Sequence, residues 1–148
     1  MTITICSSAN FYQHAVEVEE ALRALGFEVH LPKSAVRMKQ LGDFTVRKTW
    51  LADVGDYDKK ADFMRAHFDR VAEGDAVLVV NDEKHAVKNY IGGNVLLEMS
   101  LAFYLRKPIF VLNGLPEGSP FEEEILGMMP VVLNGSLDGL TEELLLKK

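Results

Sequence analysis

The sequence predicts a single α/β domain with a mainly parallel sheet, and two observations lead to this prediction. Short runs of aliphatic and β-branched residues alternate with longer segments whose apolar residues recur every three or four positions. This is the pattern of strands alternating with amphipathic helices. At 148 residues the chain also has the usual size of one domain. We therefore expect one domain over residues 1–148.

The first 31 residues contain a strand, a helix and a second strand. Residues 2–6 form a β-branched strand, and apolar residues at helical spacing predict a helix over residues 11–25. Gly26 ends that helix, and residues 27–31 form a strand that stops at Pro32. Such a short unit indicates parallel strands joined by a right-handed crossover.

The alternation resumes after an irregular stretch. Residues 33–58, which include Trp50, show no clean period, so we expect a lid, a substrate loop or a disordered segment there. Further strands are predicted at residues 76–80, 108–112 and 131–133, and helices at residues 59–73, 94–106, 121–126 and 141–147. Five strands with intervening helices predict a doubly wound, flavodoxin- or Rossmann-like sheet with helices on both faces.

Charge and composition exclude several classes of partner. The net charge is −6 and the 16 Lys and Arg residues are dispersed, which argues against a nucleic-acid polymer but permits a mononucleotide. No window approaches the roughly 18 apolar residues that a membrane span requires. The single cysteine, Cys6, fits a reducing compartment and is expected to be a buried, inert thiol. We therefore expect a cytoplasmic protein.

Several sites that are common on this fold are missing. The chain has no G-x-x-x-x-G-K-[ST] loop and no G-x-S-x-G elbow, and its first turn lacks G-x-G-x-x-G. The histidines and the cysteine show no metal-ligand spacing; they are His14, His30, His67, His85 and Cys6. We expect neither a metal nor a cofactor.

Small polar residues follow the predicted strands. Ser7 and Ser8 follow the first strand, Asn81 and Asp82 the third, and Asn113 the fourth. Open parallel sheets bind ligands beyond the carboxyl ends of their strands, so these residues are predicted to contact a small ligand. A plain turn is an equal alternative for Asn81 and Asp82.

The most informative segment is a glycine turn followed by an apolar helix. Gly92 and Gly93 allow a ligand to approach the backbone, and the helix that begins near Asn94 offers unpaired N–H groups to an anion. Glu98 shares a helix face with Asn94 and Leu101 and interrupts a stripe that otherwise predicts core. A carboxylate there is either functional, paired with a cation, or able to reach solvent.

A family resemblance enters at this helix. Positions 98–102 read Glu-Met-Ser-Leu-Ala, and Lys107 and Pro108 precede the next strand. With the preceding strand, loop and glycine turn, this order resembles the nucleoside 2-deoxyribosyltransferase family and its relatives that hydrolyse 2'-deoxynucleoside 5'-monophosphates. The resemblance covers most of the chain, from residue 3 to residue 111. Its most specific part is the family's E-x-G-x-A motif, in which Ser100 here replaces the glycine.

The resemblance implies that Glu98 is a nucleophile. It would attack C1' of the sugar and expel the base, and water or a second base would then resolve the glycosyl ester. It also implies a homodimer or larger homo-oligomer in which a neighbouring subunit closes the pocket. The positions matching those that hold sugar and phosphate are Ser7, Ser8, Gly92, Gly93 and Asn94.

His67 marks a departure from the family pattern. The family places an aspartate eight residues before the Asp that begins the third strand, and counting back from Asp75 gives His67. A histidine can replace that aspartate as an acid or base near neutral pH, or it can be a hydrogen-bonded boundary residue. Ile5 also stands where some relatives have a tyrosine.

The sequence leaves three functional hypotheses open. The first is an enzyme that cleaves or exchanges the N-glycosidic bond of a nucleoside or nucleotide through Glu98, with His67 as a second catalytic group. The second is a nucleotide-binding or sensing module without catalysis, which the His67 departure favours. An oligomerisation domain without a ligand ranks last, because it leaves the glycine turn unexplained.

Overall fold

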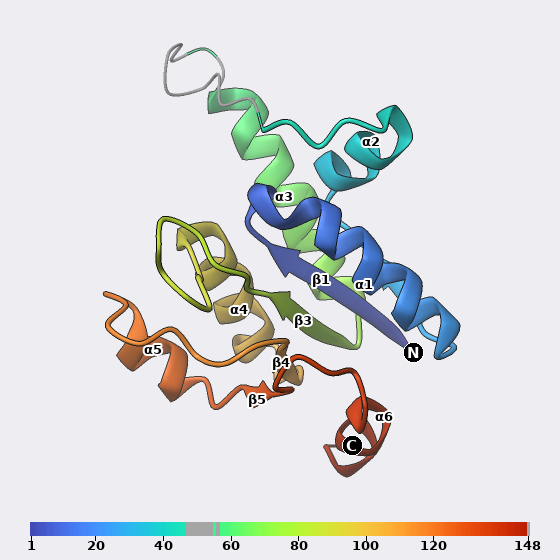
Figure 1. Ribbon diagram of the computed structural model, residues 1–148, viewed down its shortest axis with the longest axis vertical. Helices are drawn as coiled ribbons and strands as arrows, with labels where there is room; N and C mark the ends of the chain where they lie inside the picture. The colour runs from blue at the N-terminus through green and yellow to red at the C-terminus, as the bar shows by residue number, and fades with distance from the viewer. Residues whose placement is uncertain (47–54, 56, 148) are drawn as a thin grey trace.

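The chain folds around one five-stranded parallel sheet (Figure 1). The structure is a computed structural model that describes residues 1–46, 55 and 57–147. The strands are β1 (Thr2–Ser7), β2 (Glu28–His30), β3 (Ala76–Val80), β4 (Ile109–Val111) and β5 (Val131–Val132). Their order is β2-β1-β3-β4-β5, and every neighbouring pair is parallel. The predicted doubly wound α/β fold is confirmed.

Two layers of helices cover the sheet. The helical elements are η1 (Ala9–Phe11), α1 (Tyr12–Ala24), α2 (Lys33–Leu41), α3 (Tyr57–Glu73), α4 (Gly93–Tyr104), α5 (Glu122–Gly127) and α6 (Leu140–Leu146). Ile3 and Ile5 of β1 share one core cluster with α1 and α6, while Cys6 shares the other with α3, α4 and α5 (Figure 1). Side chains alternate across a strand, so neighbouring residues of β1 enter different cores. β3 is buried along its whole length, as a central parallel strand should be.

The irregular stretch contains a helix that the sequence analysis missed. α2 occupies residues 33–41, so the expected absence of structure there is wrong for this part of the segment. Its only buried residue is Ala35, which explains why no apolar period is visible. Lys39 Nζ instead contacts Oε2 of the buried Glu19 on α1 at 2.9 Å. Trp50 and the rest of residues 47–54 lie outside the described residues.

The strand order places a topological switch point beside β1. The chain leaves β1 toward β2 on one side and returns to β3 on the other, so the topology switches between β1 and β3. Ser7 pairs with Val80 at the carboxyl ends of these strands. Ligands bind at such switch points in open α/β sheets. None of the described helices is long and apolar enough to cross a lipid bilayer.

Candidate active site around Glu98

Glu98 lies in the second turn of α4, beside the core rather than within its main stripe. The residues that α4 buries are Val95, Met99 and Ala102. The predicted stripe through Asn94 and Glu98 instead follows the margin of the helix, and Asn94 is exposed. The expectation that this stripe belongs to the core is therefore corrected. At 100° per residue, the buried stripe is displaced by one position, which leaves Glu98 at the edge of the core.

Three potentially reactive side chains converge at this edge. Cys6 of β1, His67 of α3 and Glu98 of α4 each place a ligating atom within 4.8 Å of the other two. His67 Nε2 lies 3.6 Å from Glu98 Oε2, which is too long for a good hydrogen bond. The side chains of His67 and Glu98 are only 6% and 13% exposed, so water screens this contact little.

The polar atoms of this cluster lack partners. Both ring nitrogens of His67 and Oε2 of Glu98 are buried without a hydrogen bond. Each such group costs about 1–3 kcal/mol of stability relative to a satisfied one. Buried polar groups are usually paired, so orphaned atoms on facing side chains indicate a site organised for something other than stability.

Burial shifts the two titratable groups in opposite directions. It raises the pKa of Glu98 to about 8, and the neighbouring Cys6 thiol offsets only part of this rise. Burial also lowers the pKa of His67 to about 4, an effect opposed by the main chain of Ile5 and reinforced by the charge of His30. Removal from water disfavours the charged form of either group. At neutral pH the facing pair therefore consists of a protonated carboxyl and a neutral imidazole.

Two members of this site were not anticipated. Cys6 is fully buried, as expected, but it contacts the site instead of being a bystander in the core. Burial raises the pKa of the Tyr12 hydroxyl, and the charge of Glu98 raises it further, so this hydroxyl lies within electrostatic range of Glu98, although Tyr12 packs against the core cluster that contains Ile5. The only sequence signal for Cys6 was strand alternation, which places it on the sheet face opposite Ile5.

The strand-end asparagines tie loops together. Asn81 is completely buried, and its Nδ2 donates to the carbonyl oxygens of Asn89 at 3.3 Å and Gly114 at 2.8 Å. Its Oδ1 accepts from the main-chain N–H of Asn113 at 3.0 Å. Nδ2 of Asn113 donates in turn to Asn81 O at 3.1 Å and to Asp82 Oδ1 at 3.2 Å. These amides are engaged with the protein, which corresponds to the turn alternative.

The first-turn serines lie at the switch point between β1 and β3. Oγ of Ser7 is buried without a hydrogen-bonding partner, and Lys84 Nζ donates to Oγ of Ser8 at 3.1 Å. Across the same pair of strand ends, His14 Nδ1 lies 2.7 Å from Asp82 Oδ2. Sequence analysis missed the role of His14 because its partner is 68 residues away.

The glycine turn leaves backbone open to a ligand. Gly93 is exposed, and a Cβ atom added there would meet no atom within 4 Å. Gly92, the N-cap of α4, has extended backbone, and an added Cβ would lie 3.1 Å from the Tyr90 hydroxyl. Asn94 is exposed in the first turn of the helix. The predicted approach path along Gly93 is therefore sterically available.

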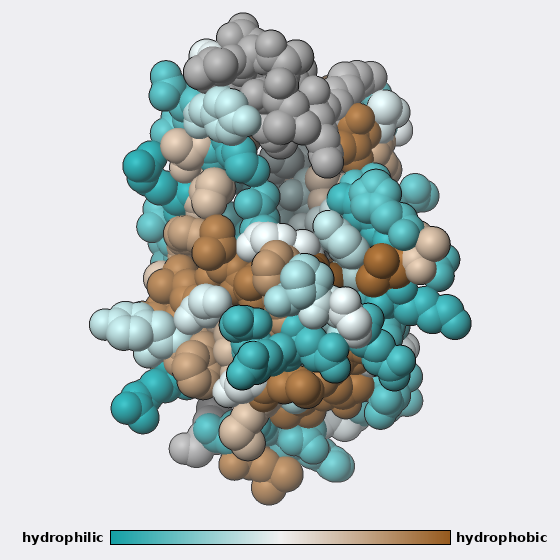
Figure 2. All heavy atoms as spheres, turned by 90° about the vertical axis from the view of Figure 1, so that its left-hand side faces the viewer, coloured by the Kyte–Doolittle hydropathy of each residue, from teal (hydrophilic) through white to brown (hydrophobic). Residues whose placement is uncertain are grey.

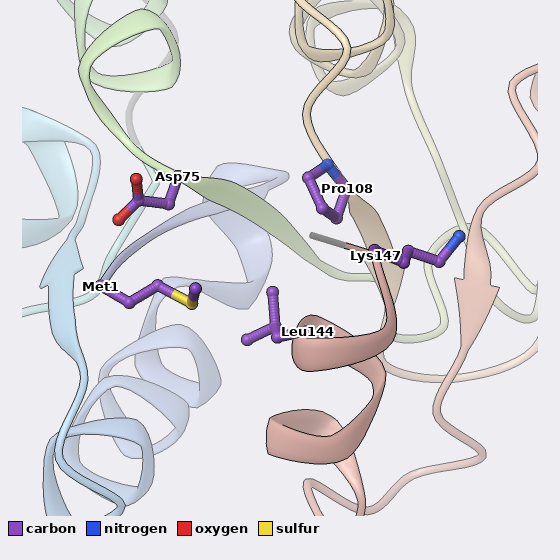
Figure 3. A pocket seen from close by; sticks show the side chains of 5 residues that line it. All are labelled: Met1, Asp75, Pro108, Leu144 and Lys147. Atoms are coloured by element: carbon purple, nitrogen blue, oxygen red, sulfur yellow. The ribbon is translucent and has the colours of Figure 1, made fainter.

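A surface hollow of about 340 Å³ lies at the opposite end of the sheet (Figure 3). It is bordered by Met1, Asp75, Pro108, Leu144 and Lys147, which come from the amino-terminal ends of the strands and from the region of α6. Asp75 Oδ2 already accepts a hydrogen bond from the Thr2 N–H at 2.7 Å. None of the predicted site residues lines this hollow, so it gives no support to the predicted ligand site.

Comparisons with known proteins add no assignment. No protein-family model matches the chain, and no curated protein matches it. The resemblance to the deoxyribosyltransferases therefore stays an expectation from the helix motif and the order of the elements. The chemistry has to be argued from the cluster around Glu98.

Proposed function

We propose that the protein cleaves the N-glycosidic bond of a nucleoside or nucleotide, or exchanges its base, with Glu98 as nucleophile. The observation that carries this proposal is the buried, unpartnered Oε2 of Glu98 beside the carboxyl end of β1. Within the described part of the chain, no Lys or Arg pairs with Glu98, so an ion pair does not account for its burial there. This position on an α/β switch-point fold is consistent with a reacting carboxylate.

The proposed reaction proceeds in two steps. The Glu98 carboxylate forms a bond to C1' of the sugar as the C1'–N bond breaks, and the electron pair leaves with the base, which takes up a proton from solvent. Water, or a second base, then attacks C1' and releases the carboxylate from the glycosyl ester. Attack by water on this ester gives hydrolysis, and attack by a second base gives transfer.

His67 is proposed as the second catalytic group, whose uncharged ring contacts the Glu98 carboxylate when it forms. Its uncharged Nε2 is 3.6 Å from Oε2 of Glu98, within reach after a small movement of either side chain. Glu98 must lose its proton to solvent before it attacks, because an imidazole whose pKa is lowered to about 4 is too weak a base to take it from a carboxyl whose pKa is about 8. The resulting carboxylate would be poorly solvated, which favours attack on an electrophilic carbon.

Substrate binding is proposed at the carboxyl ends of β1 and β3 and at the glycine turn. Ser7 and Ser8 would contact the sugar or a phosphate, and the backbone at Gly92 and Gly93 would approach the ligand. The orphaned Oγ of Ser7 supports this assignment, as does the open space at Gly93. Asn94 is exposed at the same helix end and can contact the ligand from solvent.

A homodimer is proposed to form over the outer face of α4. Leu97 and Tyr104 on this helix are 47% and 80% exposed, and the residues facing the core are also apolar. An exposed apolar surface of this kind is often covered by a partner. Figure 2 shows apolar side chains gathered on the side of the molecule where α5 lies, and Leu126 of α5 is 52% exposed. A second copy would cover apolar surface and help to enclose the site.

A non-catalytic nucleotide-binding module is the second candidate. The observation that favours it is electrostatic, because Glu98 is protonated and His67 is uncharged at neutral pH. Such a cluster can donate and accept hydrogen bonds to a bound base or sugar without reacting. The two candidates share a binding site and differ only in turnover.

The deciding experiment measures base release from nucleosides and their 5'-monophosphates, followed by chromatography. Wild type is compared with Glu98→Gln, and Glu17→Gln on the exposed face of α1 is the matched control. Release by wild type and Glu17→Gln, with loss in Glu98→Gln, supports the enzyme. Thermal stabilisation by a nucleotide without release supports the binding module. If the protein shows no base release and no thermal stabilisation by a nucleotide, both candidates are excluded.

A further inference from the structure

The cluster beneath α4 has the composition of a transition-metal site. A thiol, an imidazole and a carboxyl from three different elements, Cys6, His67 and Glu98, place ligating atoms within 4.8 Å of one another. Tetrahedral zinc holds sulfur and nitrogen ligands about 3.5 Å apart, given metal–ligand distances near 2.3 and 2.0 Å. Closing the cluster onto an ion therefore requires movements of about 1 Å from separations of at most 4.8 Å.

Three buried polar atoms of His67 and Glu98 have no hydrogen-bonding partner in the described part of the protein. His67 is only 6% exposed, and both of its ring nitrogens lack a hydrogen bond. Oε2 of Glu98 is likewise unpartnered and lies 3.6 Å from Nε2 of His67. A bound cation would take the lone pair of one His67 ring nitrogen and one lone pair of Glu98 Oε2, and would remove the cost of leaving these two atoms unsatisfied.

The donor set favours zinc over a hard cation. Thiolate and imidazole ligands suit Zn²⁺, whereas Mg²⁺ and Ca²⁺ require oxygen ligands. A dication held by the thiolate of Cys6, the carboxylate of Glu98 and the neutral ring of His67 has no net charge. The complete site therefore buries no uncompensated charge, which is the condition for placing ions in an apolar core.

We propose that Cys6, His67 and Glu98 bind one Zn²⁺ ion, and that this ion inhibits the protein by occupying the carboxylate that would otherwise react with substrate. The binding part stands on the geometry alone, and the inhibitory part rests on the proposed function. Three protein ligands leave a fourth position for water. Zinc loading releases the protons of the bound thiol and carboxyl to solvent.

Cobalt(II) is the probe for this site, because a thiolate bound to it gives a near-ultraviolet charge-transfer band. Cys6 is the only cysteine of the chain, so any such band must come from it. We expect a band that saturates at one Co²⁺ per chain, disappears on addition of Zn²⁺, and is lost in Cys6→Ser and weakened in His67→Asn. The matched control is His85→Asn, which removes an exposed imidazole and should leave the titration unchanged.

X-ray absorption of the zinc-loaded wild type keeps the test independent of how the variants fold. The expected spectrum has one sulfur at about 2.3 Å and nitrogen or oxygen ligands at about 2.0–2.1 Å. Absence of a saturable cobalt band, absence of a sulfur neighbour around zinc, or a band that survives in Cys6→Ser would overturn the site.

Base-release assays with and without zinc distinguish the metal site from the proposed enzymatic function. Chelator-treated protein should release base, zinc should suppress the release, and chelator should restore it. Base release without a cobalt band would leave the enzyme standing and refute the metal site. A cobalt band without base release by metal-free protein would leave the metal site standing and refute the enzyme and the inhibitory role. Base release that persists in zinc-saturated protein would refute inhibition.

Discussion

Nε2 of His67 and Oε2 of Glu98 face each other 3.6 Å apart between α3 and α4, and neither atom has a hydrogen-bonding partner. The same burial that leaves these atoms unpartnered also makes both groups uncharged at neutral pH. Ionising either one costs free energy of folding, because the charge is removed from water. The pair is therefore expected to link stability, reactivity and pH.

Stability should fall between pH 6.5 and 8 because of Glu98. Its pKa rises from 4.5 to about 8 on folding, so the unfolded chain loses this proton first and rising pH favours unfolding. His67, lowered from 6.5 to about 4, has the opposite effect, but only below pH 6.5. The uncompensated loss between pH 6.5 and 8 is about 2 kcal/mol, at roughly 1.4 kcal/mol per pH unit.

Urea unfolding with chelator present measures this loss. In Glu98→Gln the decrease between pH 6.5 and 8 should disappear, whereas Glu17→Gln should behave as wild type. An unchanged pH dependence in Glu98→Gln would mean that Glu98 does not hold its proton in the folded state.

The rate of base release should increase with pH. If the Glu98 carboxylate is the nucleophile, kcat/KM follows its ionised fraction and rises with an apparent pKa near 8 in metal-free protein. The measurement is an initial-rate profile across neutral and mildly alkaline pH. A profile that falls over this range would indicate that the protonated carboxyl acts, and that Glu98 is an acid rather than a nucleophile.

Gly93→Ala should separate ligand binding from folding. The added methyl group meets no atom within 4 Å, so stability should stay equal or rise by up to about 1 kcal/mol, since alanine favours a helix. If substrate approaches the backbone there, KM should rise severalfold. Gly127→Ala is the control, because its Cβ is equally free and it lies away from the site. Equal KM values in both variants would remove Gly93 from the binding surface.

Asn81→Ala should destabilise the fold. The substitution removes three hydrogen bonds of a completely buried amide. The Gly114 carbonyl oxygen is one of the groups that lose the hydrogen bond from this side chain. We expect a loss of about 2–4 kcal/mol, measured by denaturant unfolding. The exposed Asn10→Ala should change the free energy of unfolding little. A stable Asn81→Ala protein with impaired ligand binding would instead favour a direct contact with ligand.

Polar substitution on the outer face of α4 should disrupt self-association. Leu97→Gln combined with Tyr104→Gln removes exposed apolar surface, and sedimentation velocity should show the wild-type dimer converted to monomer. The fold should persist because both side chains are largely exposed. Leu25→Gln, at the end of α1 on the other side of the sheet, is the matched control. A monomeric wild type would refute the proposed interface.

Local patterning predicted most elements within a few residues of their bounds. Residues 76–80 form β3 as expected, because an uninterrupted aliphatic run suits a strand that is buried on both faces. α2 was missed for the converse reason, since it buries only Ala35 and is held by the Lys39–Glu19 contact. A short helix that relies on tertiary contacts has no apolar period to reveal it.

The sequence by itself determined the parallel α/β fold and singled out Glu98, because hydrophobic period, strand ends and an acidic residue in an apolar helix are all local features. Only the tertiary structure brought Cys6 and His67 to Glu98, and only it engaged the amide of Asn81 within the protein. These relationships join residues from different elements, so they depend on strand order and on how α3 and α4 pack. The altered pKa values of His67 and Glu98 arise in the same way, because desolvation is produced by the surrounding fold rather than by sequence neighbours.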